Sequence, residues 1–142
     1  MRETRPFYRV FTVTKYEAAV QQIEAAIAAF HAGHLAVTIT LAAAAEEMAP
    51  GKAGGLWATI RDNPSRPVEK NNWSDKLNET RNWLKHHDKP GETRALASFE
   101  AGLFIMRAMD KWEPWTPAMI AFKDLWFSSP KLTRPEDYSL DK

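Results

Sequence analysis

The sequence contains no cysteine and no large excess of charge of either sign. Without cysteine, disulfides, thiolate metal sites and cysteine nucleophiles are all excluded, which is consistent with a cytoplasmic protein. The 19 basic and 18 acidic side chains leave a net charge of +1. No overall field therefore attracts the chain to nucleic acid or to an anionic membrane, and binding of either would need a local patch of charge.

Long apolar runs and several common motifs are also missing. The N-terminal stretch MRETRPFYRVFTV has three arginines but no apolar run of about 7–15 residues, so we expect no secretory signal. No stretch is long and apolar enough to span a bilayer, and we expect no membrane association. The chain has no glycine-rich phosphate loop, no serine triad and no pair of helices typical of a DNA-reading motif.

The composition that remains is that of an ordinary globular protein. Hydrophobic residues make up 44% of the 142 residues and charged residues 26%, which is enough for one core without disulfides. We therefore expect a single helical domain over residues 1–142. Residues 1–14 would form an N-terminal arm, and residues 130–142 a poorly ordered tail.

Apolar residues at three- and four-residue steps predict most of the chain to be helical. The predicted helices cover Lys15–Ala32, His34–Met48, Leu56–Ile60, Trp73–His87, Glu92–Lys111 and Ala118–Ser128. The fifth of these is the most apolar on several sides and is expected to be the central helix. Together they predict an all-α fold, an antiparallel bundle of four to five helices.

Helix ends and connections follow from residues that stop or cap helices. Either Asn72 or Ser74 is expected to cap the fourth helix, and Thr116 the last one, with Pro117 at its first position. Phe7–Thr14 is rich in aromatic and β-branched residues, which favours a short strand or an extended arm lying across the bundle. Asp62–Asn72 is predicted to be a polar loop.

The densest polar stretch, RNWLKHHD, occupies residues 81–88 on the predicted helix Trp73–His87. At about 100° per residue, two opposite faces form on this helix. The core face consists of Trp73, Leu77, Thr80 and Leu84, and the opposite face of Asp75, Glu79, Asn82 and His86. Arg81 and Lys85 flank the core face. Such a stripe is usually only solvated, but Trp83 lies off the core face and the apolar stripe is narrow, which favours a second helix packing there.

Arg81-Asn82-x-x-x-His86 resembles the R-x4-6-H motif, with a polar residue after the arginine, of the HEPN superfamily. More loosely, NWLKHHD over residues 82–88 and TPAMIAF over residues 116–122 resemble uncharacterised bacterial proteins that have an NFLKHAD-like helix followed by a Thr-Pro-x-Met-x-x-Phe segment. The second resemblance covers about half of the chain and brings no activity with it.

The HEPN resemblance implies a small bundle of four or five helices and, for many members, a metal-independent ribonuclease of toxin or defence type that acts as a homodimer. It assigns Arg81 to phosphate binding and transition-state stabilisation, Asn82 to orientation, and His86 to catalysis. It implies no cofactor and no metal. An antidote or other partner protein is a further partner consistent with this class.

The chemistry of the residues agrees with these roles. Histidine titrates near neutral pH, so His86 can move a proton, and an arginine fork suits a phosphate. Lys85 and His87 would add positive charge for an RNA backbone, and Trp83 a stacking surface for an unpaired base. However, Arg81 and His86 point about 140° apart on a regular helix, so a second subunit or an unwound last turn would be needed.

Other readings stay open. His31 and His34, with Glu46, Glu47 and the histidines at 86 and 87, supply enough ligand types for a metal, although a role as polar groups at helix ends is favoured. Glu46 and Glu47 either orient Arg81 or a histidine across the bundle or form a plain pair of charges at a helix end. The rival function is a non-catalytic helical domain that binds another protein.

Overall fold

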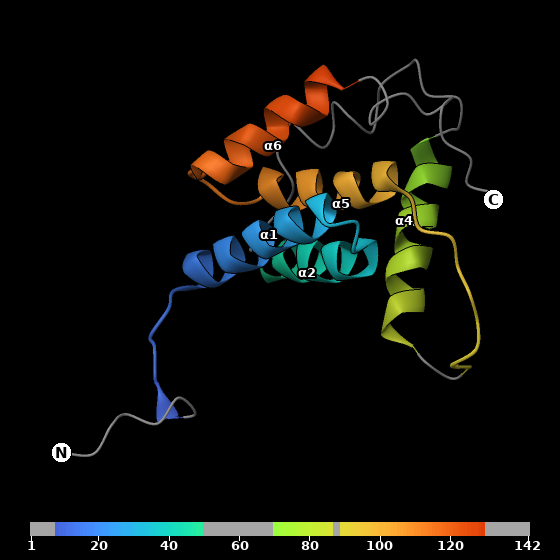
Figure 1. The fold of residues 1–142 in the computed structure, drawn as a ribbon, viewed down its shortest axis with the longest axis horizontal. Helices are drawn as coiled ribbons and strands as arrows, with labels where there is room; N and C mark the ends of the chain where they lie inside the picture. The colour runs from blue at the N-terminus through green and yellow to red at the C-terminus, as the bar shows by residue number, and fades with distance from the viewer. Residues whose placement is uncertain (1–7, 50–69, 87–88, 130–142) are drawn as a thin grey trace.

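The computed structural model describes residues 8–49, 70–86 and 89–129. Helices account for the regular structure in these residues, which contain no strand, so the prediction of an all-α bundle is confirmed (Figure 1). The helices are α1 (Lys15–His31), α2 (Leu35–Met48), α4 (Lys70–Lys85), α5 (Ser98–Asp110) and α6 (Pro117–Ser128). The predicted helix over Leu56–Ile60 and the predicted tail over residues 130–142 lie outside the described residues. So does most of the predicted loop over Asp62–Asn72, but its last three residues belong to α4, so the loop prediction was wrong there.

Helices α1 and α2 form a hairpin whose ends agree with the prediction to within one residue. Thr14 caps α1 in a capping box with Glu17, and Gly33 allows the turn because it adopts a φ of 80°. The contact between the two helices is made largely by alanines and isoleucines, and the small alanine side chains let the helices approach closely. α2 packs on α1, α4 and α5, which explains its nearly apolar sequence.

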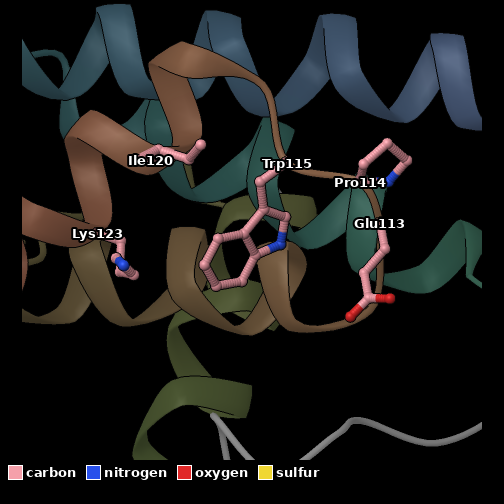
Figure 2. Close-up of a pocket in the computed structure, with 5 residues that line it drawn as sticks. All are labelled: Glu113, Pro114, Trp115, Ile120 and Lys123. Atoms are coloured by element: carbon pink, nitrogen blue, oxygen red, sulfur yellow. The ribbon is translucent and has the colours of Figure 1, made fainter.

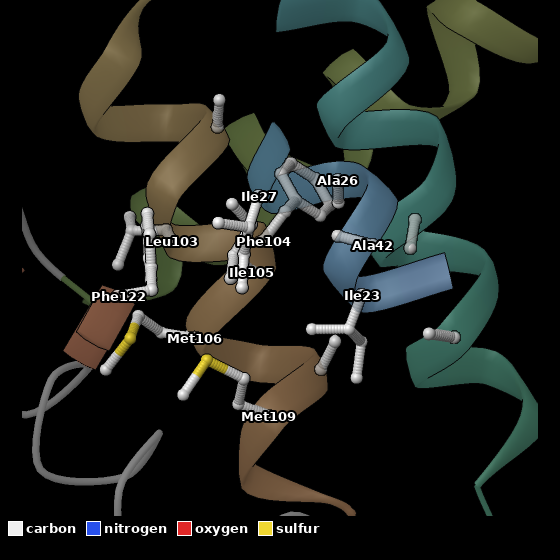
Figure 3. Close-up of a cluster of buried hydrophobic side chains, with 14 of the residues drawn as sticks. Ile23, Ala26, Ile27, Ala42, Leu103, Phe104, Ile105, Met106, Met109 and Phe122 are labelled. Atoms are coloured by element: carbon white, nitrogen blue, oxygen red, sulfur yellow. The ribbon is translucent and has the colours of Figure 1, made fainter. Parts of the chain in front are cut away.

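Helix α5 is the central helix, as predicted, because almost every residue from Phe99 to Met109 is buried. Figure 3 shows its side chains meeting those of α1, α2 and α6 in one core. Its predicted start at Glu92 was wrong, since the helix begins at Ser98. The preceding segment is held out of helical geometry by bonds to α4: Trp83 Nε1 donates to Glu92, and Arg94 Nη2 donates to Thr80 at 2.7 Å.

Helix α6 packs antiparallel on α5, as its ring contacts require. Trp126, at the end of α6, stacks on Phe99, at the start of α5, with ring centroids 5.7 Å apart. Gly102, three residues after Phe99, lies against the same ring, and a methyl group there would come within 2.3 Å of Trp126. The predicted cap is confirmed: Thr116 Oγ1 accepts from the Met119 amide, and Pro117 is the first helical residue.

Helix α4 crosses the other helices steeply (Figure 1). Leu77 and Thr80 are fully buried, and the Thr80 hydroxyl donates to Glu100 on α5 at 2.6 Å. The helix begins at Lys70, so Asn72 and Ser74 lie inside it, and the prediction that one of them caps it was wrong. Asparagine or serine inside a helix lowers its stability by only about 0.5 kcal/mol relative to alanine. It ends at Lys85, where the His86 amide bonds to the Trp83 carbonyl and tightens the last turn.

Residues 8–13 form an extended arm but neither a strand nor a cover for the bundle. Val10 is 89% exposed and Phe11 70% exposed, and the arm leads away from the helices (Figure 1). The prediction that this segment lies across the bundle was therefore wrong for the described residues. A strand needs a neighbour with free backbone groups, and the described helices offer none. None of those helices is long and apolar enough to cross a lipid bilayer.

Candidate functional site

The arginine of the predicted motif is held by α2. Arg81 Nη1 lies 3.2 Å from Glu47 Oε1, and Lys85 Nζ lies 3.2 Å from the same oxygen. Arg81 and Lys85 are four residues apart, so they share the face of α4 that meets the end of α2. The cations also lie near the carbonyl end of α2, where positive charge is favoured by the helix dipole. The sequence left open whether the Glu46–Glu47 pair contacts Arg81 or only forms a pair of charges at a helix end, and the structure shows contact of Glu47 with Arg81.

The neighbouring carboxylate is buried and is paired with α5 instead. Glu46 Oε2 accepts from Arg107 Nε at 2.9 Å and lies 3.9 Å from Lys111 Nζ. The Glu46 side chain is 6% exposed, so its charge depends on these cations for compensation. Next to it, Trp112 Nε1 donates to the Ala45 carbonyl at 2.8 Å, which fixes the end of α2 against the end of α5.

These two sets of ion pairs are formed by neighbouring residues at the end of α2 and are here together called the charge cluster. It consists of Glu46 and Glu47 from α2, Arg81 and Lys85 from α4, Arg107 from α5, and Lys111, which caps the end of α5. Glu47 is contacted by the first two cations and Glu46 by the other two. Sequence reasoning missed Arg107 and Lys111, although their four-residue spacing beside a buried stripe would have placed both on one face of α5.

The other predicted site residues point elsewhere. Asn82 and His86 are exposed, and no described contact joins either side chain to Arg81. Since Arg81 faces α2 while Asn82 and His86 face solvent, one copy of the chain does not aim the motif arginine and histidine at a common atom. His87 lies outside the described residues.

Trp83, the predicted stacking residue, is half-buried and is engaged within the chain. Its indole nitrogen donates to the carboxylate of Glu92, which belongs to the segment that crosses α4. The half-burial explains how a tryptophan is tolerated off the core face of the helix. The edge of the indole ring that carries Nε1 is therefore already in contact with Glu92.

The histidines and glutamates considered for a metal site, His31, His34, Glu46 and Glu47, do not come together. His31 is the last residue of α1 and His34 caps the start of α2, whereas Glu46 and Glu47 lie at the other end of α2. A helix of 14 residues separates the two pairs by about 20 Å. Among the residues that the structure describes, no three His, Asp or Glu side chains are grouped as metal ligands would be.

A groove of about 800 Å³ lies on another part of the surface, at the turn between α5 and α6. Figure 2 shows the indole of Trp115 at its centre, with Ile120 and Lys123 on one side and Glu113 and Pro114 on the other. Trp115 is held in place because its Nε1 donates to the Met109 carbonyl at 2.8 Å. None of the predicted site residues lines this groove.

Compared with protein-family models, curated proteins and solved structures, the chain has no match. The HEPN resemblance therefore depends on Arg81, Asn82 and His86 and on the all-α fold class alone.

Proposed function

We propose that this protein binds RNA and cleaves it without a metal ion, acting as a homodimer in the manner of HEPN domains. The observation that supports the proposal most directly is that two cations in the last turns of α4, Arg81 and Lys85, share the single carboxylate of Glu47, directly before His86 in the chain. A nearly neutral chain needs such a local excess to attract a phosphate backbone.

The accessible edge of the cluster consists of Lys85 and Glu47, which are 54% and 46% exposed, with Arg81 behind them at 23%. A phosphodiester that approaches this edge can take over the contacts that Glu47 makes with the two cations, because it offers oxygens of the same charge and similar geometry. Glu46, Arg107 and Lys111 are more buried and would serve as the support that holds the ends of α2 and α5 in place.

The cleavage step would be an internal transesterification. One histidine removes the proton of a ribose 2′-hydroxyl, the 2′-oxygen attacks phosphorus, and the bond from phosphorus to the 5′-oxygen breaks as a second histidine protonates that oxygen. Two copies of the chain would supply two His86 side chains, one as base and one as acid. Within one copy, Arg81 and His86 point in different directions. In a dimer, the histidine of one subunit can face the arginine of the other, so both can contact the same phosphate.

The direct test is cleavage of single-stranded RNA in EDTA by the purified full chain. We expect H86A and R81A each to reduce the rate at least about 100-fold, the usual contribution of a general acid or base or of a transition-state contact. The matched control is H31A, an exposed histidine at the other end of the bundle, which should leave the rate unchanged. Folding of each variant is followed by circular dichroism. No cleavage by the parent protein, or an equal loss in H31A, contradicts the proposal.

A second candidate is a non-catalytic domain that binds another protein. The observation in its favour is that Arg81 and Lys85 already share a carboxylate, while large apolar side chains are exposed on the arm and on α6. This candidate predicts that R81A and H86A change no RNA-directed activity. It also predicts that substitutions of exposed apolar residues such as Ile120 and Phe127 abolish an interaction.

A further inference from the structure

The arm exposes apolar side chains that the described helices do not cover. Val10, Phe11 and Val13 are 89%, 70% and 47% exposed, and they follow one another along a segment that stands away from the helices (Figure 1). Exposed apolar side chains are common singly, but a run of them on an extended segment indicates a surface that is buried in another state of the protein.

The groove at the turn between α5 and α6 has the shape and chemistry to receive such a segment. Its surface is apolar at Pro114, Trp115 and Ile120 and charged at both edges, with Glu113 on one side and Lys123 on the other (Figure 2). The apolar surface continues along α6 to Phe127, seven residues after Ile120 and thus on the same face, where the side chain is 55% exposed.

The arm begins beside this groove. The Tyr16 hydroxyl, in the first turn of α1, donates to the carbonyl of Pro114, which lines the groove. The direction in which the arm leaves α1 is set at Thr14, whose amide donates to Glu17 and whose hydroxyl accepts from the Glu17 amide. Residues 7–14 contain no glycine or proline and are rich in β-branched side chains, so the arm favours an extended course over a sharp reversal into its own groove.

We propose that the arm of one copy, residues 8–13, binds in the groove of a second copy, and that the two copies exchange arms reciprocally about a twofold axis. Because side chains alternate along an extended segment, Val10 would face Ile120 on one side of the groove, and Phe11 would lie against Trp115. Arg9, whose guanidinium lies 4.9 Å from the Phe11 ring in the single chain, would face the carboxylate of Glu113. The exchange would be reciprocal because each arm starts beside a groove, and a twofold axis that passes close to this point places the start of each arm next to the partner's groove. The exchange involves neither Arg81 nor His86 and does not depend on the proposed function.

The first test measures the mass of the full chain in solution over a range of concentrations. We expect a species of twice the 16.1 kDa chain, about 32 kDa. R9E and E113R should each raise the dissociation constant at least about tenfold, because each places like charges together. The combined variant R9E/E113R should restore the dissociation constant to near that of the parent. A monomer at all concentrations, or a dimer that neither single variant weakens, overturns the proposal; the latter result leaves a dimer through the motif helices intact.

The second test distinguishes exchange from an arm that folds back on its own chain, and it uses the absence of natural cysteine. Chains carrying V10C alone are mixed with chains carrying I120C alone and oxidised. We expect a disulfide-linked pair, formed at several times the yield of a control mixture of V10C with V37C, an exposed site on α2. Equal yields in the two mixtures overturn the proposal. So does the double variant V10C/I120C if it closes its disulfide within single chains only.

Discussion

Gly102 is the position where helix propensity and tertiary packing disagree most sharply. It lies in the middle of the buried helix α5, where glycine costs about 1 kcal/mol relative to alanine. From propensity alone, G102A should therefore stabilise the protein. In the structure, however, an added methyl carbon would lie 2.3 Å from Cζ3 and 2.9 Å from Cε3 of Trp126.

Ordinary contact begins at about 3.4 Å, so the ring would have to move by 3.4 − 2.3, or about 1.1 Å. Trp126 is 2% exposed and stacks on Phe99 and Phe122, with centroids at 5.7 and 6.5 Å, so its ring has no free direction in which to move. Overpacking costs about 1–3 kcal/mol, and the shortness of this contact puts G102A in the upper part of that range, at about 2–3 kcal/mol. Allowing for the gain in propensity, we expect G102A to lower the free energy of unfolding by about 1–2 kcal/mol and the melting temperature by about 3–6 °C.

The measurement is urea and thermal unfolding followed by circular dichroism. G91A is the matched control, because nothing lies within 4 Å of a methyl group at that exposed glycine, and it should be neutral or slightly stabilising. In a W126L background the clash is removed, so adding G102A should be neutral or favourable. A G102A protein that is as stable as the parent would refute the reasoning, and so would an equal loss in the W126L background.

The remaining predictions concern the two carboxylates of the charge cluster. E46A should destabilise the protein by about 2–4 kcal/mol in urea unfolding, since it removes the buried carboxylate that Arg107 and Lys111 contact, whereas E47A should cost less than about 1 kcal/mol at its exposed site. Equal costs would show that burial does not distinguish the two carboxylates. If the cluster binds phosphate, E47Q should strengthen binding of single-stranded RNA several-fold and steepen its salt dependence in fluorescence anisotropy, because Arg81 and Lys85 lose a competing carboxylate. Weaker binding by E47Q would count against that role.

Several features of the fold were predictable because their causes are local in the chain. The spacing of apolar residues and Gly33 placed α1 and α2 to within a residue, and the Thr116-Pro117 pair placed the start of α6. The start of α5 was not predictable in this way. Its six preceding residues have acceptable helical character, but Glu92 and Arg94 are bonded to α4, and such bonds leave no local pattern.

The same distinction between local and long-range causes applies to the candidate site. The sequence by itself determined the spacing of Arg81, Asn82 and His86 on one helix and hence the divergence of their directions, because the helical repeat sets those angles. Only the tertiary structure decided that Arg81 meets Glu47, that Arg107 and Lys111 close on a buried Glu46, and that Trp126 lies on Gly102. These pairs are separated by 24 to 65 residues, and their partners are chosen by the way whole helices pack rather than by any signal near either residue.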